Sequence, residues 1–265
     1  MPIPTHPARR LASGALLPLR AVAWLGARPA LWPLTLLPVV LTLVGIVAGT
    51  IAAVPLSAKL LATVWADPSG WLGAAWWLAR AAVFLVLVYV AAVTLPVVVA
   101  APLMDRLSAR VEELELGAIA GEGGLRRAAA EAARGIANTL ARTGLFLLGH
   151  VVLLPVLLVP FAWPVLAFLW TAWWSSIEWL DLPMTRHLHR LGEVRAALAA
   201  IRPLGFGMGA TLAALFLLPL ANLLVVPVGA VSGTLLYCEL VRGGVIADRR
   251  LPAEALPPPS RRATP

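Results

Sequence analysis

The chain has 265 residues, of which 60% are hydrophobic and only 13% are charged. Soluble domains are nearer half apolar and about a quarter charged, so this composition excludes an ordinary soluble protein. It also excludes a disordered chain, because so much apolar surface cannot remain in water. A single cysteine, Cys238, cannot form a disulfide within its own chain, which excludes a secreted disulfide scaffold. We therefore predict an integral membrane protein.

The net charge of +8 comes almost entirely from arginine, since the chain has only one lysine, Lys59. The basic residues lie between apolar stretches and do not form one dense patch with interleaved aromatics, so we expect no nucleic-acid partner. Arginines in this arrangement are typical of topology signals that face anionic membrane lipids.

The first apolar segment, residues 11–27, is too short and too interrupted to span a membrane. Arg20 lies within it, which argues against the apolar core of a cleavable signal peptide. We predict one interfacial helix here, with Leu16, Leu19 and Ala23 inward and the arginines at lipid head groups.

Two uncharged stretches are long enough to cross a bilayer. Residues 31–54 form a run of 24 residues, about 36 Å long as a helix, and residues 81–101 form a run of 21. A turn at 67–70 and a cluster of tryptophans at the far interface are expected to connect them. Arg80, beside those tryptophans, is expected to snorkel to the same interface.

Two amphipathic helices are predicted after the second span. The first, 103–117, prolongs that span into water and ends at Gly117, and a turn at 121–124 leads to the second, 125–142. One face of the second helix carries Ala129, Ala132, Ile136 and Leu140. We interpret the pair as a helical hairpin outside the membrane with a solvated charged face.

Two further apolar stretches, 143–177 and 203–238, have 35 and 36 residues without an acidic or basic side chain other than His150. A single straight helix of that length would be about 53 Å, which exceeds a hydrocarbon core of about 30 Å. Both stretches have prolines near the middle, and Leu153-Leu154-Pro155 is echoed by Leu217-Leu218-Pro219. We predict two helical hairpins whose arms each enter only part of the bilayer.

Arginine placement supports this topology. The segments before residue 29, from 102 to 142, from 178 to 202 and after 238 carry four, six, four and five arginines. The positive-inside rule places all of these segments in the cytoplasm, so both termini are expected there.

Three stretches in order resemble the family of CysZ-type sulfate permeases and etoposide-induced membrane proteins. The matching segments are Ala100–Leu107, Trp179–Met184 with His187, and, in the last hairpin, Gly205–Gly207, Pro219–Asn222 and Pro227–Thr234. The resemblance covers roughly residues 15–242. It identifies as motif residues Pro102, Asp105, Asp181, Pro183, Arg186, His187, Pro219 and Pro227.

This resemblance implies a fold of two long transmembrane helices plus two half-penetrating hairpins, and sulfate uptake for sulfur assimilation in a bacterial inner membrane. One feature differs from the family pattern. Sulfate permeases have a basic pair near the start of the first span, whereas this chain has Trp32 and Pro33, so that Arg28 is the nearest cation.

The candidate anion-binding or pathway residues are Arg28 and Asn222. Arg28 lies at the mouth of the first span, where its guanidinium could bind an anion or anchor the chain at lipid head groups. Asn222 lies at the expected tip of the last hairpin, where it could meet a permeating ion or cap a broken helix. Asp181 is expected to cap a helix running from 184 to 201, with pairing to Arg186 or gating as alternatives.

The sequence shows no sign of catalysis or of a cofactor. His187 and His189 are two residues apart on the predicted helix and do not share a face, which disfavours a metal site, and His150 is interpreted as a satisfied buried histidine. We find no P-loop, metalloprotease motif or nucleophile with a base in reach, so we expect neither an enzyme nor a cofactor.

The predicted fold class is an all-α integral membrane protein with amphipathic interfacial helices. Residues 1–242 are expected to form one membrane domain, followed by a Pro/Arg-rich cytoplasmic tail at 243–265. The leading hypothesis is a permease for a small anion, with sulfate preferred. Two spans and two half-hairpins cannot enclose a polar pathway alone, so a homo-oligomer in contact with membrane lipids is implied. The alternative is a non-transporting scaffold or lipid-interacting protein of the same fold.

Overall fold

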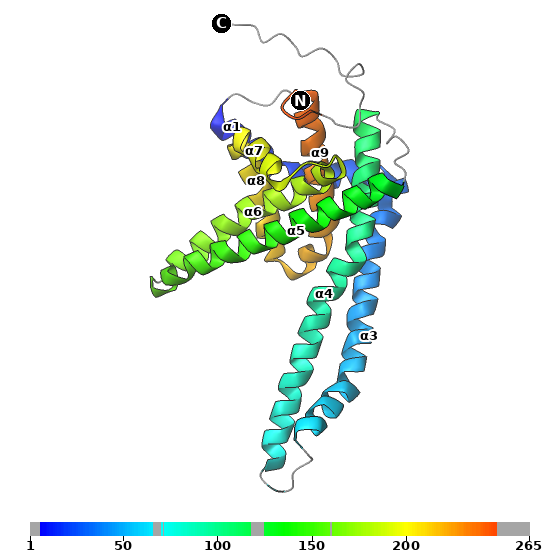
Figure 1. Cartoon of the computed structure of the whole chain (residues 1–265), viewed down its shortest axis with the longest axis vertical. Coiled ribbons are helices and arrows are strands. Elements are labelled where there is room, and N and C mark those ends of the chain that lie inside the picture. Colours follow the sequence, from blue (N-terminus) through cyan, green and yellow to red (C-terminus); the bar gives the residue numbers. More distant parts are fainter. Residues whose placement is uncertain (1–5, 66–69, 71, 118–124, 160, 248–265) are drawn as a thin grey trace, which may run out of the picture. The chain divides into compact units, whose positions relative to one another are not determined.

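The computed structural model describes residues 6–65, 70, 72–117, 125–159 and 161–247, without the side chains of 92–101, 125–128 and 219–223. Within these ranges the chain is helical with short connections and has no β-strand (Figure 1). The expected turns at 67–70 and 121–124 lie mostly outside the described residues, as does most of the expected tail at 243–265.

The described helices follow one another with few intervening residues. They are α1 (Pro7–Ala15), α2 (Leu17–Gly26), η1 (Pro29–Leu31), α3 (Trp32–Val64), α4 (Leu72–Leu116), α5 (Leu125–Leu153), η2 (Leu154–Leu158), α6 (Ala162–Arg186), α7 (Leu191–Ala200), α8 (Arg202–Phe216) and α9 (Pro219–Arg242). The chain divides into two compact units, residues 32–104 and the remainder.

The unit of residues 32–104 contains α3 and most of α4. α3 continues for 33 residues, with Pro38 and Pro55 inside it, so the helix extends ten residues beyond the predicted span of 31–54. The apolar pattern continues beyond Pro55, and apolar surroundings favour keeping the backbone helical. Arg80 of α4 donates to the carbonyl oxygen of Val54 at 3.3 Å, and its guanidinium carbon lies 4.9 Å from the ring centroid of Trp77.

The other unit is built around α6, α8 and α9, against which α1, α2 and α5 pack. Small residues allow these helices to approach closely. A Cβ atom at Gly14 of α1 would collide with the backbone of Leu204 of α8, and one at Gly233 of α9 would collide with the backbone of Trp179 of α6. Close backbone contacts at small residues are typical of helices packed inside membranes.

The N-terminal segment forms two helices where one was predicted. Leu16 ends α1 and Pro18 lies in the first turn of α2, where its missing N–H costs nothing. Leu17, Ala21 and Leu25 are buried against other helices, whereas Leu16, Leu19 and Ala23 are exposed on the described chain. The inward orientation of Leu16, Leu19 and Ala23 on an interfacial helix stays a prediction.

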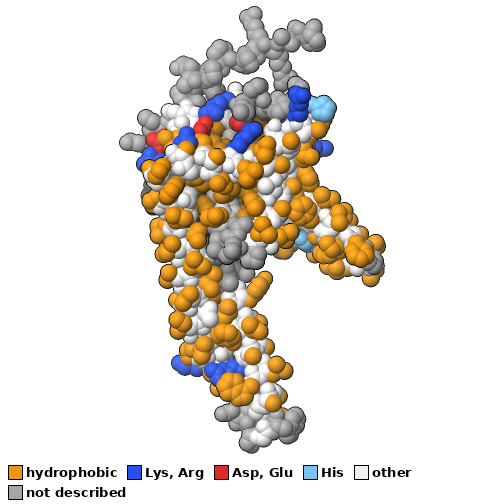
Figure 2. Space-filling model, turned by 180° about the vertical axis from the view of Figure 1, so that it is seen from behind, with side chains coloured by type: hydrophobic (Ala, Val, Ile, Leu, Met, Phe, Trp, Pro, Cys, Tyr) orange, Lys and Arg blue, Asp and Glu red, His pale blue; other side chains and the backbone are white. Residues whose placement is uncertain are grey.

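The structure interrupts both long apolar stretches close to the repeated Leu-Leu-Pro sequences. α5 ends at Leu153 and is followed by η2. α8 ends at Phe216, and two residues separate it from Pro219, the first residue of α9. α5 packs against α6, and α8 against α9, so each stretch forms a pair of contacting helices. The surface of the α5–α6 pair is covered by hydrophobic side chains (Figure 2).

α4 is a single helix that ends before Gly117, whose φ of +65° suits glycine at a helix C-terminus. α5 begins at Leu125 as predicted, but it continues into the apolar stretch, and Ile136 and Leu140 are exposed. In this part of α5 the side chain of Asn138 is buried, and its hydrogen bonds to the end of α6 are described below.

Length and composition make four described segments suitable for crossing a membrane: Pro29–Val64, Leu72–Ala91, Ala129–Leu158 and Leu224–Arg242. They differ in their surroundings. In the last segment 72% of the most apolar window is buried, whereas in the third none is. The α7–α8 pair is also apolar enough, with a bend of 107°. The described chain is therefore an all-helical protein with several helices that could span a membrane.

Candidate functional site

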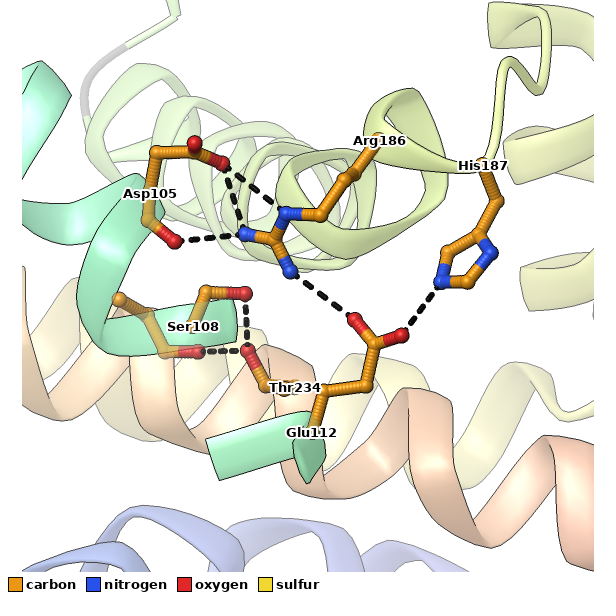
Figure 3. A network of polar contacts seen from close by, with 7 residues as sticks. Asp105, Ser108, Glu112, Arg186, His187 and Thr234 are labelled. Atoms are coloured by element: carbon orange, nitrogen blue, oxygen red, sulfur yellow. Dashed lines mark hydrogen bonds and ion pairs between the residues drawn. The ribbon is translucent and has the colours of Figure 1, made fainter. Parts of the chain in front are cut away.

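The last three turns of α4 carry a polar face that packs against the end of α6. Asp105, Ser108 and Glu112 are spaced by three and four residues, which places them on one side of the helix. Arg186 and His187, at the end of α6, face them (Figure 3). We call Asp105, Glu112, Arg186 and His187 the charged core.

In the charged core, Arg186 contacts two carboxylates at once. Its Nη1 donates to Glu112 Oε2 at 2.9 Å, and its Nη2 donates to Asp105 Oδ1 at 2.7 Å. The other Glu112 oxygen, Oε1, lies 2.7 Å from His187 Nε2 (Figure 3). The side chains of Arg186, Glu112 and His187 are only 6%, 4% and 0% exposed. Charges this deep require both a partner and hydrogen bonds, and this arrangement supplies both.

α9 completes the surroundings of the charged core. Thr234 Oγ1 lies 2.8 Å from Ser108 Oγ of α4 (Figure 3). The Tyr237 ring of α9 stacks on His187, with ring centroids 5.0 Å apart. The core thus connects α4, α6 and α9, which are far apart in sequence.

A second buried cluster connects α5 to the end of α6. Asn138 Nδ2 donates to Asp181 Oδ1 at 2.8 Å and to the His189 carbonyl oxygen at 3.1 Å. Arg142 Nη1 lies 3.2 Å from Asp181 Oδ2, and Thr185 Oγ1 donates to Oδ1. Burial raises the pKa of Asp181, although the charge of Arg142 and the hydrogen bonds from Thr185 and Asn138 oppose this shift.

The predicted role of Asp181 as the cap of a helix from 184 to 201 is wrong, because α6 continues through Pro183 to Arg186. Leu188 then takes a left-handed conformation with φ of +60°, and His189 N–H donates to the carbonyl oxygen of Met184 at 3.0 Å. This is a Schellman ending with leucine where glycine is usual. Asp181 pairs with Arg142 and not with Arg186.

A cavity of about 210 Å³ lies where α2, α4 and α9 meet. It is lined by Leu17, Arg20, Trp24, Glu115, Leu235, Glu239 and Arg242. We call this cavity the vestibule. Glu115 accepts hydrogen bonds from Trp24 Nε1 at 2.7 Å and from Arg242 Nη2 at 2.8 Å. Burial alone would raise the pKa of Glu115, but these two hydrogen bonds and the charges of Arg242 and Arg28 lower it overall.

Arg28, the predicted anion-binding residue, lies beside the vestibule. Its guanidinium carbon is 3.8 Å from the centroid of the Trp24 ring, and its Nη1 donates to the Trp24 carbonyl oxygen at 3.1 Å. Arg20 is partly exposed, and its guanidinium has no hydrogen bond or ion pair in the part of the chain that the structure describes. The vestibule therefore brings Arg20 and Arg242 together with Arg28 close by, against Glu115 and Glu239.

The remaining predicted residues are dispersed. Asn222 and Pro219 lie in the first turn of α9, and their side chains are outside the described residues. Pro102 is exposed on α4, whereas Pro183 and Pro227 are buried inside α6 and α9. The structure does not bring Arg28 and Asn222 together at one described site.

Several polar residues of these clusters were missed from the sequence: Glu112, Asn138, Arg142, Glu115 and Arg242. The charges at 102–142 were expected to face solvent, yet Glu112 is buried, and so is the uncharged Asn138. A signal was present for Glu112, because it continues the polar face of Asp105 and Ser108. Its partners, 74 residues away, carried no such signal.

Among the described residues no group of three histidine, cysteine or acidic side chains could hold a metal ion. The sequence itself is informative about relatives. Residues 17–227 match the family described as Sulfate transporter CysZ/Etoposide-induced protein 2.4. That description is of transporters, not of enzymes.

Several curated relatives are also named sulfate transporters. Sulfate transporter CysZ of Vibrio atlanticus is 27% identical over 59% of this chain and 64% of its own length. Sulfate transporter CysZ of Pectobacterium atrosepticum is 27% identical over 63% of this chain and 62% of its own length. A shorter match, to the protein of that name from Vibrio cholerae, is 33% identical over 36% of each chain. The chain thus spans a little under two thirds of the length of the first two relatives.

Proposed function

The chain belongs to the Sulfate transporter CysZ/Etoposide-induced protein 2.4 family, and from this premise we propose that it is a permease for a small inorganic anion, with sulfate as the preferred substrate. The relatives named sulfate transporters support the choice of substrate. The vestibule supports a role in anion capture.

The observation that carries this proposal is the vestibule with its unpaired arginine. Guanidinium groups bind oxyanions through two parallel N–H donors, and Arg20 has these donors available on the described surface. Arg28 and Arg242 add positive charge, while Glu115 holds Arg242 in place. Sulfate permeases have a basic pair at the positions of Trp32 and Pro33, and the arginines of the vestibule take over the role of that pair in this proposal.

The charged core has a different proposed role, as a structural clamp outside the pathway. Arg186 directs four of its five N–H donors to Asp105 and Glu112, and its charge is already paired with these two carboxylates, so it is a poor ligand for sulfate. The clamp fixes the ends of α4 and α6 against α9. Its rigidity keeps Glu115, one turn beyond Glu112 on α4, positioned for Arg242.

The proposed membrane arrangement has α3 and α4 as full spans and the α5–α6 and α8–α9 pairs as half-penetrating hairpins. The break of each hairpin near a Leu-Leu-Pro sequence supports this arrangement. The proposed location is a bacterial inner membrane with both termini in the cytoplasm, following the arginine distribution. The exposed apolar surface of α5, with Leu147, Val151 and Val152 each more than half exposed, suits lipid or a further copy in a homo-oligomer.

A second candidate function is a non-transporting membrane scaffold of the same fold. The stacking of Arg28 on Trp24 favours it, because a guanidinium held in this way also serves as an anchor at the interface. The two candidate functions are distinguished by anion transport, which a permease carries out and a scaffold does not.

The test is uptake of labelled sulfate into liposomes that contain the purified protein, with chloride and phosphate as competitors. We expect saturable uptake that falls about ten-fold or more in Arg20→Gln and in Arg28→Gln, since each removes a charged donor to the anion. Asn222→Ala tests the predicted residue at the start of α9. Arg9→Gln is the matched control, because Arg9 is an exposed arginine of α1 outside the vestibule.

Uptake no greater than in protein-free vesicles, with the protein folded by circular dichroism, would overturn the permease assignment in favour of the scaffold. Equal loss in Arg9→Gln and Arg20→Gln would show that bulk charge, and not the vestibule, attracts the anion.

A further inference from the structure

A second basic cavity lies at the elbow between α7 and α8, apart from the vestibule. Its volume is about 510 Å³, and its lining residues are Trp173, Gly192, Arg195, Ala196, Ala199 and Arg202. The α7–α8 bend of 107° brings Arg195, on α7, and Arg202, the first residue of α8, to the same cavity. Gly192, Ala196 and Ala199 recur on the same side of α7 and leave room between the two arginines.

The side chains of the two elbow arginines have no polar partner among the described residues. Arg195 and Arg202 are both exposed, and neither guanidinium makes a hydrogen bond or an ion pair in the described ranges. The neighbouring acid, Glu193, does not line the cavity, and its side chain accepts a hydrogen bond from the Arg190 backbone N–H at 2.7 Å. The elbow therefore presents two free guanidinium groups beside one another.

An apolar cavity of about 550 Å³ adjoins the elbow. It lies between α5 and α6 and is lined by Leu145, Leu148, Gly149, Val152, Leu153, Leu166, Leu169, Trp170, Trp173, Trp174 and Arg195. Arg195 and Trp173 line both cavities, so the basic elbow and the apolar groove share a boundary. Nearly all of the groove lining is hydrocarbon or indole, with Arg195 at the shared edge.

We propose that the elbow and the groove together form a binding site for an anionic glycerophospholipid. The phosphate group is held by Arg195 and Arg202, and an acyl chain lies along the α5–α6 groove. A basic pocket joined to an apolar groove fits a molecule with an anionic head and a long apolar chain, and a free oxyanion would use only the first half. Trp173, at the boundary, suits the level of the head group because its indole is amphipathic.

This site is independent of the anion transport proposed above. None of its lining residues belongs to the vestibule, since α2, α4 and α9 contribute nothing to the elbow or the groove. Lipid binding and sulfate uptake can therefore each fail while the other is retained.

The test is native mass spectrometry of the full-length protein, purified in detergent, delipidated and titrated with phosphatidylglycerol or phosphatidylcholine. We expect one phosphatidylglycerol to bind in preference to phosphatidylcholine, and the double variant R195Q/R202Q to weaken phosphatidylglycerol binding about thirty-fold. The matched control is R9Q/R106Q, which removes two exposed arginines from outside both cavities.

A second variant fills the elbow without changing its charge. A Cβ atom added at Gly192 would meet nothing within 4 Å, so Gly192→Leu places a side chain in open space. Leucine also favours the helix over glycine, so the variant is expected to fold and to lose the bound lipid.

Three results would overturn the proposal. One is unchanged phosphatidylglycerol binding in both R195Q/R202Q and Gly192→Leu. Another is equal weakening in R9Q/R106Q, which would indicate attraction by net charge alone. The third is displacement of the lipid by millimolar inorganic phosphate or sulfate, or equally tight binding of deacylated glycerophosphoglycerol, either of which would assign the elbow to a free anion.

Discussion

Arg186 and Glu112 form a buried ion pair, and removing either partner would leave the other charge buried and unpaired. Both side chains are at least 94% removed from solvent, and Glu112 also faces His187. A buried pair contributes little net stability compared with apolar residues of equal size, but one buried charge without its partner is strongly unfavourable. The clamp therefore gives this region one defined arrangement of α4 against α6.

Replacing Arg186 by glutamine is expected to destabilise the protein by about 3–5 kcal/mol, because Glu112 loses its charged partner while it remains buried. The measurement is denaturant-induced unfolding in detergent, followed by circular dichroism. Arg110→Gln is the control, since Arg110 pairs with Glu113 on the exposed surface and is expected to change stability by about 0.5 kcal/mol or less. Similar losses in the two variants would contradict a buried clamp.

Asp181 predicts a pH dependence of stability. Its pKa is raised in the folded chain by burial, above the ordinary value of 3.8. The stability that this group contributes is therefore present below its unfolded pKa and is lost as pH rises through the folded pKa. We expect the wild type to gain thermal stability relative to Asp181→Asn as the pH falls from about 7 to about 4.

Glu115 provides the opposite control. Its pKa is lowered overall, so its contribution is present above 4.5 and is lost as pH falls through the folded pKa. The wild type should lose stability relative to Glu115→Gln under acidic conditions. A constant difference between wild type and Asp181→Asn across this pH range would show that Asp181 titrates with its ordinary pKa.

At the scale of residues, the sequence singled out members of the polar clusters better than it indicated their partners. The motif residues Asp105, Asp181, Arg186 and His187 all lie in the two polar clusters. Asp181 was assigned a capping role because the following Pro183 resembles a helix start, whereas the helix accommodates this proline. Pairing across 39 to 81 residues depends on tertiary packing, which no local pattern encodes.

Among the elements, the end of α6 has a strained backbone turn that connects α6 to α5 and α7. Leu188 adopts φ of +60°, a conformation unfavourable for a residue with a Cβ atom, and the turn directs the His189 carbonyl oxygen to Asn138. This turn allows α7 to begin at Leu191, whose N–H donates to Asn138 Oδ1 at 3.2 Å. One asparagine thus joins α5 to the α6–α7 connection.

Substitutions at Leu188 are expected to follow backbone preference more than hydrophobicity. Leu188→Gly should lower the melting temperature less than Leu188→Val does, because glycine adopts positive φ freely while a β-branched residue resists it. The melting temperatures of the two variants, measured in the same detergent, give the comparison. A larger loss with glycine would mean that side-chain packing, and not the left-handed turn, determines the residue at this position.

The succession of helices was largely predictable, and their boundaries were not. Apolar runs identified α3, α4 and the two interrupted stretches, and Gly117 was correctly assigned as a helix end. Pro55 and Pro183 were expected to lie outside helices, yet α3 and α6 continue through them. Proline is a weaker boundary in an apolar chain, because neighbouring groups satisfy the freed carbonyl and no water competes for the backbone.

Across the whole molecule, the single cysteine makes the proposed topology measurable. Cys238 is the single cysteine of the sequence and is fully buried. Its replacement by alanine therefore gives a background without thiols. Val64, at the end of α3, is 88% exposed, and Arg190, before α7, is also exposed.

In intact cells we expect V64C to react with a membrane-impermeant maleimide while R190C reacts only after permeabilisation. The reason is that residues 178–202 are rich in arginine and are proposed to be cytoplasmic, opposite the connection between α3 and α4. The degree of labelling is read by gel shift. Equal labelling of both positions from outside would contradict the proposed orientation.

The burial of α9 bears on how the chain is made. This helix is the last of the described helices to leave the ribosome, and α2, α6 and α8 all pack on it. Translation proceeds at about 5–20 residues per second, so about 10–40 seconds separate the synthesis of α2 from that of its partner, α9. During that interval the surfaces that α9 covers, including the hydroxyl of Ser108 and the ring of His187, lack their contacts with α9 and face the insertion machinery or lipid. Biogenesis of this protein therefore depends on keeping a half-built bundle from associating with the wrong helices until its C-terminal helix arrives.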